Sequence, residues 1–102
     1  MADLLDAAGV ERALAELTDW SGDGTGIRRT VELASFPVAV QVVDRVAEVA
    51  EQLDHHPDID IRWRTLTFGC ATHSAGGVTD RDVALARLID EIVAASARFG
   101  DG

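Results

Sequence analysis

The spacing of apolar residues changes at Pro57, and this change restricts the fold more than any other feature of the sequence. Before Pro57, apolar side chains recur at the intervals of one helical face: Val42, Val46, Val49 and Leu53. After it, apolar and polar residues alternate over 59–63 and 66–70, which is typical of half-buried strands. Because proline disfavours helical geometry in the preceding residue, we predict a helix that Ser35 caps and that stops around His56, followed by two strands.

The flanking segments predict the remaining elements. Apolar spacing favours a first helix over about residues 6–17 and a last helix from 79 to about 98. Between the first two helices, a glycine-dense turn at residues 21–26 precedes a β-branched run at 27–33, which predicts a hairpin. The expected order is αββαββα, an α+β fold in which three helices pack on one face of a four-stranded antiparallel sheet.

Size and charge limit the kind of protein. The 102 residues fit one domain spanning residues 1–102. The net charge is −9 and every basic residue is arginine, so a nucleic-acid backbone would be repelled and we expect no direct nucleic-acid binding. No apolar run approaches the roughly 20 residues that cross a bilayer, and the first residues are acidic where a signal peptide is basic. We therefore expect a cytoplasmic protein that contacts no membrane.

The side-chain inventory leaves few groups for proton transfer. The sequence contains no lysine and no tyrosine, which excludes a Schiff-base amine and a phenolic acid. The single cysteine, Cys70, lies in an alternating apolar run and is expected in the core. Acid–base chemistry near neutral pH therefore falls to histidines and carboxylates.

The three histidines lie where two of the predicted elements end. Glu51 and His55 are one helical turn apart, and His56 and Pro57 follow at the carboxyl end of the helix. His73 ends the second strand of the following pair, so a hairpin returns it toward the first two histidines. Taken alone, a histidine at a helix end often only complements the helix dipole. Two adjacent imidazoles before a proline instead favour a cleft lined by all three.

The positions of these residues follow a longer pattern. An acidic residue is followed by three residues, His-His-Pro, five residues, an aromatic residue, nine residues, a histidine and later an aspartate. The residues are Glu51, His55, His56, Pro57, Trp63, His73 and Asp82. With Trp20, Phe36, Thr72 and Gly76-Gly77, the sequence resembles the pterin-4a-carbinolamine dehydratases over nearly its whole length. It departs from the family at Val31 and Leu33, where phenylalanine is common, and at Arg64, and these changes leave the fold alone but can alter the pocket.

The resemblance implies a 4a-hydroxytetrahydrobiopterin dehydratase, a hydro-lyase. Such an enzyme removes water from a 4a-hydroxytetrahydropterin to give the quinonoid dihydropterin, in recycling of a tetrahydrobiopterin-type cofactor. The reaction needs an acid to protonate the leaving hydroxide and a base to accept a pterin proton. By resemblance His55, His56 and His73 are catalytic: His55 and His73 transfer the protons, and His56 binds and orients the pterin. The resemblance also implies no bound cofactor or metal, and a homodimer or homotetramer.

The resemblance further implies a set of substrate-binding residues: Glu51, Asp54, His56, Pro57, Trp63, Thr72 and Asp82. For three of them a second interpretation stays open. Glu51 either favours the protonated form of His55 or is an exposed helix carboxylate. Asp82 more simply caps the last helix than contacts substrate. Trp63 either stacks on the pterin or, as the alternation of the strand favours, continues the inward apolar face.

Two other functions compete with catalysis. Glu51, Asp54 and the three histidines offer ligands to zinc or iron, although adjacent histidines at a helix end diverge and Cys70 has no partner thiol. Alternatively the fold serves as a protein-binding module, since members of this family act as a dimerisation cofactor, and relatives without the full histidine set act as assembly factors. Because all three histidines are present, the resemblance favours catalysis.

Overall fold

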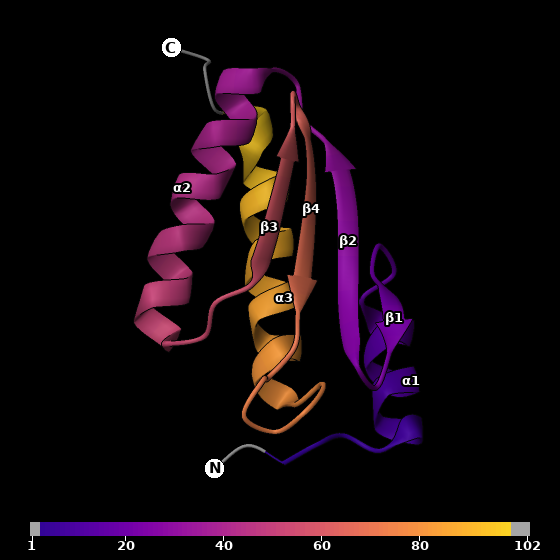
Figure 1. Ribbon diagram of the computed structural model, residues 1–102. Helices are drawn as coiled ribbons and strands as arrows, with labels where there is room; N and C mark the ends of the chain where they lie inside the picture. Colours follow the sequence, from indigo (N-terminus) through magenta and orange to yellow (C-terminus); the bar gives the residue numbers. More distant parts are fainter. Residues whose placement is uncertain (1–2, 99–102) are drawn as a thin grey trace.

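The structure, a computed structural model, describes residues 3–98 of the chain. Its elements follow the predicted αββαββα order (Figure 1). They are α1 (Ala7–Glu16), β1 (Ser21–Asp23), β2 (Gly26–Glu32), α2 (Phe36–Leu53), β3 (Asp58–Arg62), β4 (Thr65–Cys70) and α3 (Asp80–Ala95), followed by a 3-10 turn at Ser96–Arg98. The predicted α+β fold is confirmed.

The strands form one antiparallel sheet in the order β1-β2-β4-β3. β1–β2 and β3–β4 are hairpins, and β2 pairs with β4 at the centre, from Ile27 opposite Cys70 to Glu32 opposite Thr65. Helices α2 and α3 cover one face of the sheet, so that its other face is open (Figure 1). The core contains Leu66, Phe68 and Cys70 of β4, and the expectation that Cys70 is a core residue is confirmed.

Polar contacts tie α3 to the sheet. The carboxylate of Asp90 on α3 accepts hydrogen bonds from the indole N–H of the buried Trp20, at 2.8 Å, and from the guanidinium of Arg29 on β2, at 2.6 Å. The first of these bonds satisfies the one polar side-chain atom of Trp20 inside the core. No helix within residues 3–98 is long and apolar enough to cross a membrane.

Helix α2 ends earlier than predicted. The side chain of Ser35 accepts a hydrogen bond from the amide of Val38, as the predicted cap requires. The helix stops at Leu53 and not around His56, because Asp54 adopts the left-handed conformation, with φ of 50°, and its N–H closes the last turn. His55 and His56 therefore leave the helical path.

The expectation that Trp63 continues the apolar face is wrong. Pairing of β3 with β4 ends at Arg62 opposite Thr65, so Trp63 lies in the hairpin turn with a positive φ of 56°. The turn interrupts the strand alternation, and the Trp63 side chain is 70% exposed. The guanidinium of Arg64 lies over its ring, 4.8 Å from the ring centroid.

Candidate active site

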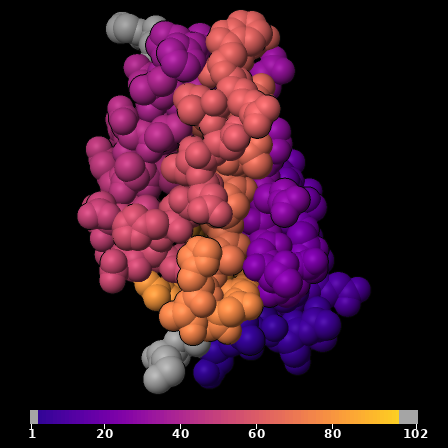
Figure 2. Space-filling view, viewed as in Figure 1, coloured from indigo at the N-terminus to yellow at the C-terminus, as the bar shows by residue number. Residues whose placement is uncertain are grey.

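The carboxyl ends of α2 and β4 lie at the same end of the molecule, and a hollow of about 240 Å³ opens there. The three histidines line it together: His55 and His56 come from the segment after α2, and His73 comes from the loop after β4. The other lining residues are Asp54, Ala71, Thr72, Ser74 and Arg81. In the space-filling view the loop after β4 lies between the end of α2 and the β1–β2 hairpin (Figure 2).

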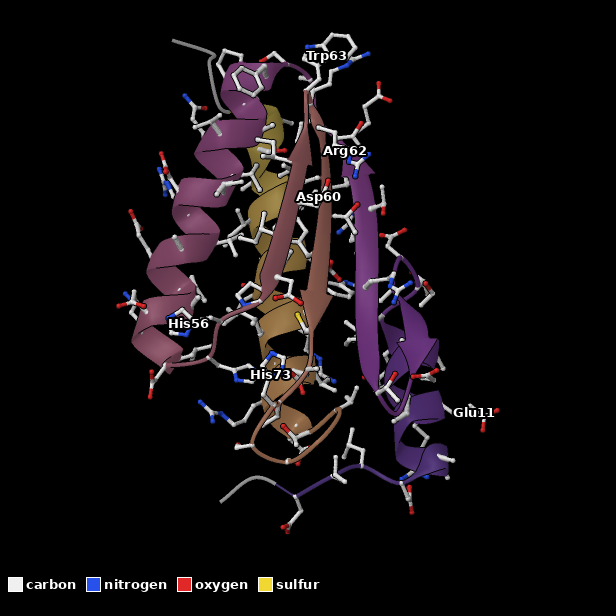
Figure 3. All side chains as sticks on the ribbon, in the orientation of Figure 1. Glu11, His56, Asp60, Arg62, Trp63 and His73 are labelled. Atoms are coloured by element: carbon white, nitrogen blue, oxygen red, sulfur yellow. The ribbon has the colours of Figure 1, made fainter. Side chains whose placement is uncertain are left out.

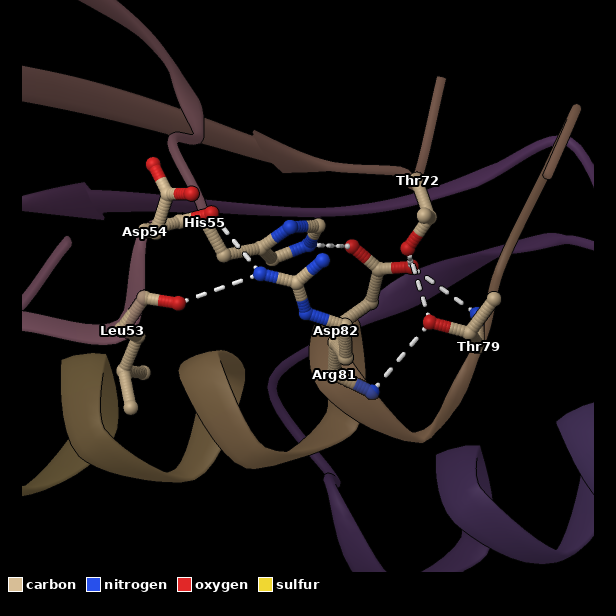
Figure 4. A network of polar contacts seen from close by, with 7 residues as sticks. All are labelled: Leu53, Asp54, His55, Thr72, Thr79, Arg81 and Asp82. Carbon is tan, nitrogen blue, oxygen red and sulfur yellow. Dashed lines mark hydrogen bonds and ion pairs between the residues drawn. The ribbon is translucent and has the colours of Figure 1, made fainter. Parts of the chain in front are cut away.

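His55 is held from inside the protein. Its side chain is 8% exposed, and its Nε2 lies 2.5 Å from Oδ1 of Asp82, which is fully buried (Figure 4). Since a carboxylate accepts, Nε2 carries the proton in this contact, and Nδ1 makes no hydrogen bond within residues 3–98. The contact thus fixes the ring orientation and leaves one nitrogen for exchange of a proton with a ligand.

Asp82 is both a helix cap and the anchor of His55. It is the third residue of α3, and its Oδ2 accepts from the N–H of Thr79 at 2.9 Å, forming the predicted capping box. The same oxygen accepts from the hydroxyl of Thr72 at 2.8 Å. Thr72 and Thr79 are joined in turn, with 2.7 Å between their hydroxyl oxygens. These hydrogen bonds offset the cost of burying the carboxylate away from water.

His56 has a different carboxylate partner. Its Nε2 contacts Oε2 of Glu51, and both side chains are exposed. The hypothesis that Glu51 acts on His55 is therefore wrong: Asp82 holds His55, and Glu51 contacts His56. The cause is the left-handed Asp54, which turns His55 inward and brings His56 back over the last turn of α2.

The loop that carries His73 is closed by backbone contacts. The amide of Thr72 donates to the carbonyl of Gly77 at 2.8 Å, and the amide of Val78 donates to the carbonyl of Gly24 in the β1–β2 turn at 3.0 Å. A Cβ at Gly77 would lie 2.3 Å from the Gly24 oxygen, so only glycine permits this approach. His73 itself is exposed, and its side chain makes no hydrogen bond within residues 3–98.

Arg81 is a site residue that the sequence did not indicate. Its guanidinium donates to the carbonyls of Leu53, at 3.1 Å, and Asp54, at 2.7 Å (Figure 4). It thereby joins the start of α3 to the end of α2, where the helix carries partial negative charge. Asp54 and Arg81 are 27 positions apart in the sequence, so no local pattern indicates this contact. The nearest sequence signal was the neighbouring Asp82, which the family pattern includes.

The remaining candidates lie at different distances from the hollow. Asp54 and Thr72 line it, whereas Glu51 and Asp82 contact histidines that line it. Pro57 is not among the lining residues. Trp63 lies at the opposite end of the sheet from His56 and His73 (Figure 3).

The polar side chains do not converge on one point. Within residues 3–98, no group of three or more His, Cys, Asp and Glu side chains is arranged to hold a metal ion. The Nε2 atoms of His55 and His56 instead face two separate carboxylates. The arrangement is that of imidazoles with individual charge partners, which suits acid–base chemistry.

Together these features define a class: a small α+β protein in which two loops, after α2 and after β4, place three histidines around one hollow at one end of the sheet. The chain belongs to the pterin-4a-carbinolamine dehydratase family, since the family model described as pterin 4 alpha carbinolamine dehydratase matches residues 3–92. A Nocardia farcinica protein named "Putative pterin-4-alpha-carbinolamine dehydratase" is 58% identical over 90 residues, 88% of this chain and 95% of the relative. A Roseiflexus castenholzii protein of the same name is 52% identical over 93 residues, 91% of this chain and all of the relative (100%).

Solved structures share the fold. A protein described as a transcriptional coactivator/pterin dehydratase from Brucella melitensis superposes with a TM-score of 0.86 at 30% identity, covering 89% of this chain and 99% of that one. A pterin dehydratase-like protein identified as a RuBisCO assembly factor in the alpha-carboxysome has a TM-score of 0.60 at 16% identity, covering 72% and 86%. At that identity the second likeness concerns the fold alone.

Proposed function

We propose that this protein is a dehydratase that removes water from a 4a-hydroxytetrahydropterin to give the quinonoid dihydropterin, without a metal. The observation that carries the proposal is the shared hollow of His55, His56 and His73, in which His55 and His56 each have a carboxylate partner. Family membership supports the same substrate class. The product would return to a tetrahydrobiopterin-type cofactor by reduction.

The proposed mechanism divides two proton transfers between two histidines. One imidazolium protonates the 4a-hydroxyl, the C4a–O bond breaks as the adjacent ring nitrogen supplies its electron pair, and water leaves. A second imidazole accepts the proton that the pterin loses. We assign these transfers to His55 and His73, and assign binding and orientation of the pterin to His56. Asp54 and Thr72 line the same hollow as further pterin contacts.

The test follows dehydration of freshly generated 4a-hydroxytetrahydropterin by ultraviolet absorbance, with and without a chelator. His55→Ala and His73→Ala should each reduce turnover by roughly 10²- to 10⁴-fold, the contribution of a positioned acid or base. Gln52→Ala changes an exposed polar residue at the carboxyl end of α2, close in sequence to His55, and serves as the matched control. Full turnover in both histidine variants would refute the assignment, and wild-type activity that disappears with the chelator would replace it by a metal mechanism.

A second candidate function is protein binding. The Brucella melitensis relative is described as a transcriptional coactivator as well as a pterin dehydratase. In this chain, Phe36, Val40, Ile61 and Trp63 expose apolar side chains that do not line the histidine hollow. A partner bound through them would leave the hollow open. If the folded wild type fails to accelerate dehydration, this function takes the place of the first.

We further propose that residues 1–102 act as one domain in the cytoplasm and assemble as a homodimer or homotetramer. Strand β3 is an edge strand, and Ile61 on it is 42% exposed, which leaves both backbone groups and apolar surface for a second copy. Sedimentation equilibrium measures the assembly directly, and a monomer at micromolar concentration would refute this proposal.

A further inference from the structure

A second hollow, of about 250 Å³, adjoins the histidine hollow. Ala71 and His73 line both. Its other walls include Arg28, Asp58 and Gly69, and we call it the Gly69 groove. The groove is about as large as the histidine hollow, so it doubles the space that one ligand can occupy at this end of the molecule, and nothing in the proposed chemistry of the histidines uses it.

The register of the sheet explains why the groove exists. Arg28 on β2 pairs with Gly69 on β4, and Gly69 pairs with Asp58 on β3, so the three residues form one row across the sheet. Because neighbouring strands lie about 4.8 Å apart, the backbones of Arg28 and Asp58 are roughly 10 Å apart. A Cβ at position 69 would stand 3.7 Å from Cβ of Asp58, on the same face. Because Gly69 has no side chain, the space between the charged side chains of Arg28 and Asp58 stays open.

The side chains of Arg28 and Asp58, on the two sides of the groove, are exposed, and Arg28 interacts electrostatically with Asp23 on β1. Neither Arg28 nor Asp58 makes a hydrogen bond or ion pair at contact distance with any residue of the described chain. Farther along the same face, by contrast, Arg62 donates to Asp60 at 3.2 Å. The groove thus offers a guanidinium donor on one side and a carboxylate acceptor on the other, beside His73.

We propose that the Gly69 groove binds the substituent at C6 of the pterin and selects a short, neutral polyhydroxyalkyl chain. This inference rests on the proposed function. In a 4a-hydroxytetrahydropterin only N5 separates C6 from the reacting C4a, so a C6 chain leaves the ring next to the proton-transfer groups. His73 borders both hollows at that point. Hydroxyl groups accept from Arg28 and also donate to Asp58, whereas a carboxylate on the chain can pair only with Arg28, has no proton to donate to Asp58, and is repelled by it.

The test is calorimetric titration with three stable pterins: biopterin, which carries a dihydroxypropyl chain, 6-methylpterin and 6-carboxypterin. Wild type should bind biopterin about tenfold more tightly than the other two, the value of one charge-assisted hydrogen bond. Arg28→Ala and Gly69→Val should remove this preference while 6-methylpterin binding stays within about twofold. Arg62→Ala, on the same face but away from the groove, should retain it.

The variants and the separate dehydration assay keep the outcomes distinct. At Gly69 the nearest heavy atoms to an added Cβ lie at ordinary contact distances, so a side chain can begin there without a clash. If Gly69→Val nevertheless misfolds, the result for Arg28→Ala decides whether the groove binds the chain. Equal binding of biopterin and 6-methylpterin, or tightest binding of 6-carboxypterin, overturns the groove even if dehydration is observed. A preference for biopterin without dehydration overturns the proposed function and upholds the groove. Failure of all three pterins to bind overturns the groove, and the dehydration assay then decides the proposed function.

Discussion

At the scale of single residues, the contact between His55 and Asp82 contributes to the stability of the fold and also orients a proposed catalytic side chain. A buried carboxylate is costly unless donors surround it, and here Thr72, Thr79 and His55 supply them. The same donors hold the imidazole in one orientation. The sequence suggested the capping role of Asp82 from its position near Thr79, but not the histidine contact, because the partners are 27 residues apart.

Asp82→Asn tests this dual role. The asparagine side chain has nearly the same shape, but its NH2 group would face hydrogen-bond donors that now point at the carboxylate, such as the Thr79 N–H. We therefore expect a loss of stability on the order of 2–4 kcal/mol. Turnover should fall by about 10²-fold, because His55 is no longer held in place. Urea unfolding and the dehydration assay measure the two effects. Asp80→Asn, an exposed carboxylate in the same first turn, should cost at most about 1 kcal/mol and leave turnover unchanged. An active Asp82→Asn protein would show that the contact is dispensable.

At the scale of elements, the sequence predicted which segments are helices and strands better than where they end. Periodicity identified α2 and the β3–β4 hairpin because their apolar faces are buried against one core. It placed the end of α2 too late and assigned Trp63 to the core, since a left-handed residue and the last paired residue of a strand leave no periodic signal. In the structure, the left-handed Asp54 takes the histidines off the helical path, and the end of strand pairing at Arg62 leaves Trp63 exposed to solvent.

The junction between α2 and α3 depends on Arg81. Arg81→Met removes two hydrogen bonds to the carbonyls of Leu53 and Asp54 while it keeps most of the aliphatic stem. We expect turnover to fall by about tenfold, because the segment that carries His55 and His56 loses its support. Arg87→Met is the matched control, since Arg87 also lies on α3 but pairs with Glu16. Steady-state kinetics measure both variants, and equal turnover of the two would contradict the role of Arg81.

At the scale of the whole molecule, the chain puts its polar chemistry at one end of a sheet whose helix-covered face is apolar. The sequence anticipated that the three histidines lie close together, because a proline and a hairpin return the chain to the same end. Their catalytic roles stay predictions. The Gly69 groove and the Arg81 contact depend on strand register and on packing between helices, neither of which a single sequence specifies.

The stability of the molecule should fall at alkaline pH because of one buried group. Burial raises the pKa of the Cys70 thiol from 9.0 to about 12. Above about pH 9 the unfolded chain releases this proton and the folded chain keeps it, so the free energy of unfolding falls with pH up to about 12. The expected slope is about 1.4 kcal/mol per pH unit. No lysine or tyrosine titrates in this range, so urea unfolding from pH 8 to 11 isolates the effect.

Cys70→Ala provides the control for this pH series. The variant should be less stable at pH 8, because it leaves a small void in the core, but its stability should be nearly flat up to pH 11. An unchanged slope in the variant would mean that another group is responsible.

The two tryptophans lie in contrasting surroundings, and this gives the protein two separable optical signals. Trp20 is buried with its indole N–H bonded to Asp90, so its emission should be blue-shifted and should report unfolding. Trp63 is exposed beside Arg64, so its emission should be red-shifted and readily quenched by iodide. Because Trp63 lies at the far end of the sheet from His73, occupation of the hollow should leave its spectrum unchanged (Figure 3). Replacing Trp63 by phenylalanine would therefore leave a chain with a single fluorophore in its core.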